Sequence, residues 1–406
     1  MLRVADLPIR SSLRERFAKM VELRRDFHRH PELGLKEKRT SSAVVAHLEK
    51  AGIAVRAGLA ETGVAGLVPG GAGRGRAILY RADMDGLPLQ EENEVPYASS
   101  HTGVMHACGH DGHTAILLET ACETKARASA LQGDITFAFQ PAEEGPGGAK
   151  PMIEAGVLRD PDIEACFGLH LWNTMPLGTI GVKAGPSMAA ADEFELFVEG
   201  KGGHGAYPHG AIDAVMVGSQ IVTAIQSIVS RNVDPFETAV VTVGTFHAGS
   251  NFNIIAERAH MKGTIRTFNP KVRSLLMRRV EETAARVAEG LGARCRVVFH
   301  EVYPATVNDP VMSDFVAEIA AELVGPDHVL RGEMSMGAED MSYFLEAVPG
   351  CYFFLGSQNE AKGLVGQHHS PRFDFDEDAM LIGAEIFLRI QERYFERFPT
   401  PPKKAA

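Results

Sequence analysis

The chain has 406 residues, of which 45% are hydrophobic and 23% charged, values typical of a globular protein with two or three domains. Its formal net charge of -11 argues against nucleic acid or an anionic membrane as a partner, because either would require a basic face, and favours a small molecule. Five scattered cysteines without CxxC spacing, no signal-peptide core and no apolar run approaching ~18 residues predict a cytoplasmic protein without disulfides or membrane spans.

Two helices and a glycine-rich connection are expected before the first buried strand. Apolar side chains at helical spacing predict a helix over Ser12–His30, and a second is expected over Ser41–Ala51. The segment Gly66–Gly75 is rich in glycine, but no Lys-Ser/Thr follows it, so a phosphate-binding loop is not expected. The prediction for this segment is a hairpin connection.

Three buried strands are then expected, and each carries metal-binding residue types at or near its end. Ligands of open α/β sheets bind at the carboxyl ends of the strands, so these side chains are expected to lie near one another. In chain order they are Asp83 and Asp85 after the strand 76–81, Glu143 and Glu144 after the strand 134–139, and His170 near the end of the strand 164–171.

The densest group of such residues is Met105–His113, with the sequence MHACGHDGH. Thiolate and neutral imidazole are preferred ligands of zinc-like ions, and Cys108 and His110 are separated by one residue. The structural alternative is a polar loop in which Asp111 caps the following helix, expected to end at Ala126, and the histidines lie on the surface. The close spacing favours the metal site.

From about Ala190 the expected order of elements is β-α-β-β-α-β, which matches a ferredoxin-like sandwich. This segment is expected to be an inserted domain over residues 188–304, between the two parts of a catalytic domain over residues 1–187 and 305–406. Its first loop, Gly200–Gly210, places His204 between glycines, where a backbone can approach a ligand closely. A flexible hairpin tip is the alternative interpretation of this loop.

After Pro304 the α/β pattern returns, with a buried strand over Cys351–Leu355 and a terminal helix. The loop between them contains His368 and His369, which adds a further histidine pair just past a strand. In the segment MSMGAEDM, Asp340 is expected to cap the short helix that follows.

Five of these residues are candidate metal ligands: Cys108, His110, Glu144, His170 and His369. Catalytic zinc sites with one ion usually have three protein ligands, so two ions sharing a bridge fit this number better. The adjacent Glu143 is a candidate general base for a metal-activated water.

With these residues in place, the sequence resembles the di-metal aminoacylase and carboxypeptidase family of metallopeptidases, in its N-acyl-amino-acid amidohydrolase branch with hippurate and auxin-conjugate hydrolases. The resemblance extends over nearly the whole chain. The matching blocks are RADMDGLPLQE, MHACGHDGH, FQPAEEGPGGA, GLHLW, GGHGAYPH, GTIRTF, MGAEDMSYF and HHSPRFDFDE.

The resemblance implies a catalytic domain with a mixed central sheet flanked by helices, plus an inserted ferredoxin-like domain that dimerises and covers the site. It implies the five ligands above for two Mn²⁺ or Zn²⁺ ions, with Co²⁺ or Ni²⁺ as alternatives. His369 is preferred over His368 because the family histidine stands two residues before the proline. The expected activity is hydrolysis of N-acyl amino acids by a homodimer or homotetramer.

Further catalytic and substrate-binding roles are also expected. Asp83 and His204 are candidate catalytic residues, the latter as an oxyanion donor that acts in its own or in the partner subunit. Arg266 and Asn253 are expected to bind the substrate's α-carboxylate, although a structural ion pair remains the alternative for Arg266.

Three alternative functions compete with this prediction. A cysteine hydrolase that uses Cys108 and His110 would leave Glu144, His170 and His369 without a role. A non-catalytic metal-binding or sensor protein would not need the spare carboxylate of Glu143. A dipeptidase or carboxypeptidase that acts on small peptides is the remaining alternative.

Overall fold

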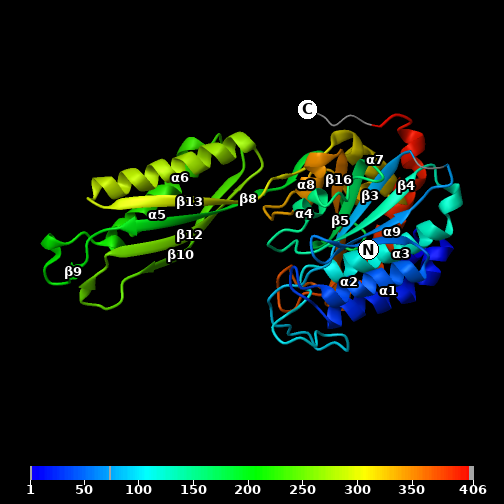
Figure 1. Cartoon of the computed structure of the whole chain (residues 1–406), viewed down its shortest axis with the longest axis horizontal. Helices are drawn as coiled ribbons and strands as arrows, with labels where there is room; N and C mark the ends of the chain where they lie inside the picture. Colours follow the sequence, from blue (N-terminus) through cyan, green and yellow to red (C-terminus); the bar gives the residue numbers. More distant parts are fainter. Residues whose placement is uncertain (1, 73–74, 402–406) are drawn as a thin grey trace. The chain divides into compact units, whose positions relative to one another are not determined.

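The computed structural model describes residues 2–72 and 75–401, and the chain divides into two compact units (Figure 1). Each unit has a hydrophobic core of its own. The predicted domain boundaries remain a prediction, and one short segment of the presumed second catalytic part, Met334–Glu339, packs with the inserted unit. The first unit comprises Met1–Gly185, Val307–Glu333 and Asp340–Ala406, and the second comprises Pro186–Thr306 and Met334–Glu339.

The first unit is built on an eight-stranded sheet with the order β1-β2-β4-β3-β5-β16-β6-β15. The four strands β4, β3, β5 and β16 are mutually parallel, while β2 is antiparallel to both of its neighbours, β1 and β4. The sheet is therefore mixed, which confirms the predicted fold class. The strands are β1 (Ala54–Leu59), β2 (Gly63–Val68), β3 (Ala77–Asp83), β4 (Asp134–Gln140), β5 (Ile163–Pro176), β6 (Ile180–Gly181), β15 (Val329–Leu330) and β16 (Gly350–Gln358).

Every residue of β3 and β4 is buried, as expected of parallel strands that are covered on both faces. Helices flank the sheet (Figure 1). In the described ranges none of the helices is long and apolar enough to cross a bilayer. The helices are α1 (Ser11–Arg29), α2 (Lys38–Lys50), α3 (His110–Ala126), α4 (Ala149–Glu154), α7 (Pro310–Val324), α8 (Met341–Ala347) and α9 (Asp378–Arg397).

The glycine-rich segment 66–75 does not connect a hairpin, so this prediction is wrong. It joins β2 to β3, and β4 lies between these two strands in the sheet. Gly66 itself belongs to β2, while residues 73 and 74 lie outside the described ranges. Close packing requires glycine at two positions of the segment, because a Cβ on Gly70 would lie 2.4 Å from the carbonyl oxygen of Gly133 and one on Gly71 would lie 2.2 Å from that of Ser129.

The second unit is a four-stranded antiparallel sheet with the order β10-β12-β8-β13 and two helices. Its elements follow one another as β-α-β-β-α-β, which confirms the predicted ferredoxin-like order. Alternate residues of β8, including Phe194, Leu196 and Val198, are buried in its core. The elements are β8 (Ala190–Glu199), α5 (Ala214–Asn232), β10 (Ala239–Ala248), β12 (Arg258–Thr267), α6 (Pro270–Gly290) and β13 (Arg294–Tyr303).

Candidate metal centre

The parallel strands of the first unit bring the five predicted ligands to one edge of the sheet. Their ligand atoms form overlapping groups, in each of which all atoms lie within 4.8 Å of one another. Cys108 belongs to two of these groups, so a single sulfur atom could contact two ions. The groups are Cys108 with His110 and His170, Cys108 with Glu144 and His369, and His110 with Glu143 and Glu144.

Distances between the ligand atoms suit a shared cation. Cys108 Sγ lies 3.5 Å from His170 Nε2, and His369 Nε2 lies 2.8 Å from Glu144 Oε1. Zinc-like ions bind nitrogen and sulfur at about 2.0–2.3 Å, so neighbouring tetrahedral ligands lie about 3.5 Å apart. The first distance matches this separation, and the second is somewhat shorter.

Hydrogen bonds orient two of the histidines so that Nε2 points into the site. Nδ1–H of His170 donates to the carbonyl oxygen of Leu171 at 2.7 Å. Nδ1–H of His110 donates to the backbone oxygen of Asp85 at 2.9 Å, and the Asp85 carboxylate lies 3.2 Å away. Such partners fix the tautomer that leaves Nε2 with a free electron pair, as metal-binding histidines require.

The buried Nε2 of His110 has no hydrogen-bond partner among the described residues. It faces two carboxylates, Asp83 Oδ2 at 3.7 Å and Glu143 Oε2 at 3.9 Å. Burial acts to lower the pKa of His110, but Asp83 and Asp85 raise it to about 10. The site therefore attracts a positive charge at this nitrogen, and the donor set fits a divalent cation in place of the proton.

Two further histidines of the site are occupied by other bonds. His113 Nδ1–H donates to Asp83 Oδ1 at 2.6 Å, and its Nε2 accepts the N–H of Leu171 at 2.9 Å. Similarly, His368 Nε2 accepts the N–H of Asn173 at 3.0 Å. Burial and nearby histidines lower the pKa of His368 to about 3, which fits a neutral ring. The geometry therefore favours His369 over His368 as the ligand.

The structure adds information on the local backbone at His369 and His170 that the sequence did not provide. His369 has a φ of 61°, a left-handed conformation uncommon for a residue other than glycine. Its N–H donates to the carbonyl oxygen of Ala107 at 2.8 Å, which ties this turn to the Cys108 loop. His170 does not end its strand, because β5 continues to Pro176.

Asp85 contacts the proposed ligands more directly than the predicted catalytic residue Asp83. Asp85 holds Nδ1 of His110, and its Oδ2 accepts the N–H of Glu144 at 3.0 Å. Asp83 instead bonds Arg81 at 2.7 Å and His113 at 2.6 Å. The sequence contained a signal for both residues, since they follow the same strand, but only contacts from other segments distinguish their surroundings.

Arg81 anchors the segments around the site from within the sheet. Its guanidinium donates to Gln140 Oε1 at 2.8 Å and to Asp340 Oδ1 at 2.9 Å. Asp340 takes the expected N-cap position of α8, but its side chain does not cap this helix. Its Oδ2 accepts the N–H groups of Gly148 and Ala149, each at 3.0 Å, at the start of α4.

A second buried network supports the start of α3. Asp111 does not cap this helix, because the N-cap is Gly109 and no side chain caps it. The Asp111 carboxylate instead accepts from Arg24 Nε and His28 Nδ1, both at 2.8 Å. Arg24 also donates to Asp374 at 2.7 Å, which links α1 to the segment after His369.

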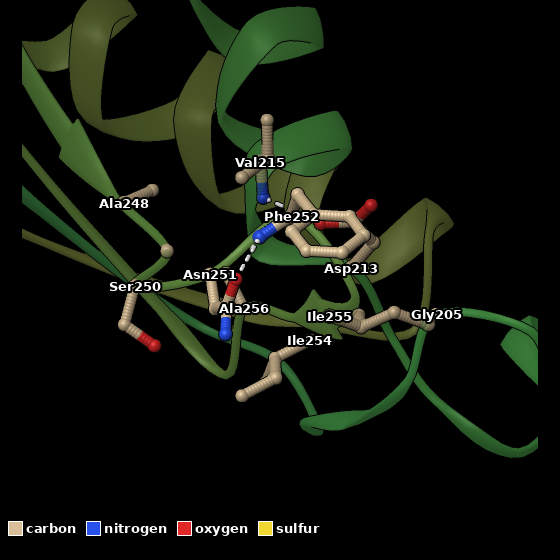
Figure 2. Close-up of a pocket in the computed structure, with 11 residues that line it drawn as sticks. Gly205, Asp213, Val215, Ala248, Ser250, Asn251, Phe252, Ile254, Ile255 and Ala256 are labelled. Carbon is tan, nitrogen blue, oxygen red and sulfur yellow. Dashed lines mark hydrogen bonds between the residues drawn. The ribbon is translucent and has the colours of Figure 1, made fainter.

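In the second unit, His204 lies on the short strand β9 (Gly203–His204), paired with β11 (Ile254–Ile255). His204 is exposed, and its Nδ1 accepts the N–H of Ala206 at 3.1 Å. The carbonyl oxygen of Asn253 accepts the N–H of Gly205 at 2.8 Å, so these predicted residues are neighbours. An open groove of about 660 Å³ lies beside them (Figure 2).

Arg266, the other predicted carboxylate ligand, is half-buried on β12. Among the described residues no carboxylate forms an ion pair with it, and the nearby Asp192 is instead bound by Arg273 at 2.8 Å. Burial lowers the pKa of Arg266, and Asp192 partly opposes this shift. The structural ion pair considered as the alternative is therefore not formed.

The two-stranded sheet of β9 and β11 lies beyond one end of the four-stranded sheet (Figure 1), whereas Arg266 lies near the other end of β12. Arg266 pairs with Ala191 near the start of β8, whereas β9 and β11 adjoin the end at Arg258. Eight residues separate Arg258 from Arg266, a distance of about 26 Å along a strand. Arg266 and His204 of one chain therefore cannot contact the same small substrate through this unit alone.

Comparison with known proteins identifies the family. Residues 79–393 match the model of peptidase family M20/M25/M40. The chain belongs to this family. The matched residues include the strands and loops that carry every proposed ligand. The chain is therefore a hydrolase of amide bonds in a metallopeptidase family.

Similar proteins include both peptidases and an amino-acid-conjugate hydrolase. Thermostable carboxypeptidase 2 of Saccharolobus solfataricus is 42% identical, with 90% of this chain and 92% of that protein covered. IAA-amino acid hydrolase ILR1-like 4 of Arabidopsis thaliana is 39% identical, with 92% and 85% covered. The Bacillus subtilis YXEP structure, described as a dinuclear metal binding peptidase, has a TM-score of 0.82 at 33% identity, covering 94% and 99%.

Proposed function

We propose that this M20-family hydrolase cleaves the amide bond of N-acyl amino acids, releasing a carboxylic acid and a free amino acid. The observation that carries the proposal is a cluster of five ligand-type side chains beside the carboxylate of Glu143. Cys108, His110 and His170 are buried, Glu144 is partly buried, and His369 lies at the exposed side of the cluster. We assign these five residues as those that would hold two divalent ions. Mn²⁺ and Zn²⁺ suit this mixed donor set, and Co²⁺ and Ni²⁺ are alternatives.

Bound ions would supply a Lewis acid for the amide carbonyl and a lowered pKa for water. Glu143 accepts the proton of the attacking water and passes it to the leaving nitrogen. Asp85 holds the imidazole of His110 through Nδ1–H and so keeps its Nε2 directed into the site. Asp83, a predicted catalytic residue, acts in this proposal through the orientation of His113.

The substrate's free α-carboxylate is assigned to Arg266. This guanidinium is half-buried and has no ion pair among the described residues, so an incoming carboxylate would satisfy it. The names of the similar carboxypeptidase and IAA-amino acid hydrolase both describe cleavage next to an amino acid. A carboxylate requirement is consistent with either kind of substrate.

His204 and Asn253 are assigned to the active site of a partner subunit. The span of about 26 Å along β12 separates them from Arg266, so one substrate can meet both groups only if two chains contribute. Exposed apolar side chains near β9, including Tyr207, Phe252 and Ile254, favour burial against a second copy. We therefore propose a homodimer formed through the second unit.

Two variants of adjacent residues test the proposed mechanism. Glu143→Gln should lower the rate by about 10²–10⁴ with unchanged metal content, because only the base is lost. Glu144→Gln should lower both the rate and the metal content. Hydrolysis of hippurate and N-acetyl amino acids by metal-reconstituted protein is the assay, and metal content is measured in parallel.

The substrate panel also separates the alternatives. Faster cleavage of dipeptides than of N-acyl amino acids would favour the carboxypeptidase alternative. Metal binding without turnover of any substrate would favour the non-catalytic one. Near-normal activity of Glu143→Gln would contradict the proposed base.

A further inference from the structure

A second cluster of metal-binding side chains lies in the first unit, between helices α2 and α3. It consists of His47 near the end of α2 and Glu119 and Cys122 on α3. One ligand atom of each residue lies within 4.8 Å of the other two. Cys122 is 12 residues along α3 from His110, which corresponds to about 18 Å. The cluster is therefore separate from the proposed catalytic centre.

The measured separations suit three ligands of one ion. His47 Nε2 lies 3.1 Å from Glu119 Oε1 and 3.3 Å from Cys122 Sγ. Neighbouring ligands of a tetrahedral zinc-like ion are about 3.5 Å apart, from bonds of about 2.0–2.3 Å. Glu119 and Cys122 are three residues apart on the helix, so both side chains face His47.

The buried oxygen Glu119 Oε1 lacks a hydrogen-bond partner among the described residues. The Glu119 side chain is 1% exposed, and among the described residues Oε1 accepts no hydrogen bond although His47 is close. A buried carboxylate oxygen without a partner is costly. A cation bound between the three side chains would satisfy it.

Neighbouring residues hold the cluster in place. Arg16 donates to the other oxygen of Glu119, Oε2, at 3.2 Å, and so leaves Oε1 directed at His47. Glu123 is bound separately, by Ser12 at 2.7 Å and by Arg16 at 3.4 Å. This arrangement resembles the outer bonds that orient ligands in metal sites.

A purely hydrogen-bonded cluster is the simpler alternative. In that case the Cys122 thiol donates to His47 Nε2, and burial together with Glu119 raises the pKa of Cys122 to about 12. This arrangement satisfies the thiol and the imidazole but gives Glu119 Oε1 no hydrogen bond, only the close approach of His47 Nε2 at 3.1 Å. Because Glu119 Oε1 accepts no hydrogen bond in this cluster, a bound cation explains the arrangement better than hydrogen bonds alone.

We infer that His47, Glu119 and Cys122 form a structural site for a soft divalent cation of the zinc class. Three protein ligands leave the fourth tetrahedral position to water. The ion would link α2 to α3, about three helical turns along α3 from His110. The inference does not depend on the proposed substrate or mechanism.

Zinc stoichiometry of the whole protein tests this site. After chelation and equilibrium dialysis against Zn²⁺, His47→Asn and Cys122→Ser should each bind one zinc ion fewer per chain than the wild type. Cys295→Ser removes a thiol on β13 of the second unit and is the matched control, with unchanged zinc content. Equal zinc content of wild type and both cluster variants overturns the inference.

Cobalt absorption provides a test that does not depend on zinc counting. In Cys108→Ser, the proposed catalytic thiol is absent, so any remaining thiolate-to-cobalt charge-transfer band must come from another cysteine. This band should persist in Cys108→Ser and disappear in Cys108→Ser/Cys122→Ser. Its absence from Cys108→Ser contradicts the inference, while loss of hydrolysis in that variant concerns only the proposed function.

Discussion

The polar side chains proposed for function differ between the two units in how completely they are bonded. In the first unit, His110, His170 and Asp85 are buried, and each has a hydrogen bond that sets its orientation. In the second unit, His204 is exposed and is bonded only within its own loop, while Arg266 has no ion pair among the described residues.

This difference indicates two modes of building a site. A metal centre requires ligands that are held in place before the ion arrives, and fixed hydrogen bonds provide this. Groups that bind substrate or a partner subunit must keep donors available until the partner arrives. Variants that disturb bonded groups of the first unit should therefore affect folding, whereas variants in the second unit should affect catalysis.

The largest effect on stability is expected for Arg24→Met. Arg24 is fully buried and bonds Asp111 and Asp374, so its loss leaves buried carboxylates without their main partner. Breaking such a pair typically costs about 3–5 kcal/mol. Urea unfolding followed by fluorescence of Trp172, the only tryptophan, measures the first unit.

The adjacent Arg25 is the matched control for this prediction. Its side chain is 45% exposed and pairs with Glu377. Surface pairs contribute about 0–1 kcal/mol, so Arg25→Met should unfold close to the wild type. Equal destabilisation by both variants would show that burial does not distinguish these arginines.

His204→Ala should lower kcat by about 10²–10³, as expected for loss of an oxyanion donor, with metal content and unfolding unchanged. The reason is that His204 is exposed and makes few contacts in its own chain. Mixing it with Glu143→Gln protein tests the partner-subunit assignment. The mixed dimer should regain activity, because one of its sites combines an intact Glu143 with the partner's intact donor.

Two results would contradict this assignment. A fully active monomer in sedimentation experiments would exclude any contribution from a partner. Failure of the two variants to complement each other, once mixed dimers are demonstrated, would place His204 in the site of its own chain.

Arg266→Ala should reduce the preference for a free carboxylate. The ratio of kcat/KM for hippurate to that for hippuramide is expected to fall by about tenfold to hundredfold, since charged hydrogen bonds contribute about 1.5–3 kcal/mol. Arg258→Ala, at the exposed other end of β12, is the control and should leave the ratio unchanged. No preference for hippurate in the wild type would exclude carboxylate recognition.

A modest effect on stability is expected for Glu385→Gln, through its ion pairs with Arg10 and Arg389, both at 2.8 Å. Burial acts to raise the pKa of Glu385, but hydrogen bonds from the two arginines lower it below its usual value. The ionised carboxylate therefore stabilises the fold above the unfolded pKa of about 4.3, by about 1–3 kcal/mol. This stabilisation is lost as the pH falls through the folded pKa.

Measurements of unfolding at neutral and acid pH test the direction of this pH dependence. The difference between wild type and Glu385→Gln should be largest near neutrality and shrink below about pH 4. Glu195 in the second unit also has a lowered pKa, through hydrogen bonds from His260 and His300, but its side chain is more exposed than that of Glu385, 17% against 3%. Glu195→Gln should therefore have the weaker effect, and the reverse order would contradict the comparison of the two units.

Sequence reasoning predicted much of the fold because buried strands and helices carry periodic patterns. The ferredoxin-like order of the second unit and the mixed sheet flanked by helices follow from such patterns together with the family resemblance. The pairing of strands was harder to predict from the sequence. The segment Gly66–Gly75 has hairpin composition, yet β4 inserts between β2 and β3, and its residues pair with β3 residues 57 positions earlier in the chain.

The candidate site shows the same division between local and distant information. Ligand types could be recognised from the close spacing of Cys108 and His110 and from the position of Glu144 just after a strand. The role of Asp340 could not, because its oxygens bond Arg81, Gly148 and Ala149, which are distant in sequence. Asp83 and Asp85 likewise look alike until the bonds to His113 and His110 are known.

The position of Cys108 in two ligand groups has a consequence for oxidative damage. Oxidation of this one sulfur to a sulfinic or sulfonic acid would alter the donor sets of both proposed ions at once. In the metal-free protein, burial and the nearby Glu144 raise the pKa of the thiol, which slows reaction with oxidants because the thiolate is the reactive form. Metal-depleted protein should thus survive peroxide through protonation of its thiol, whereas the loaded protein depends on the ions to shield the bound thiolate.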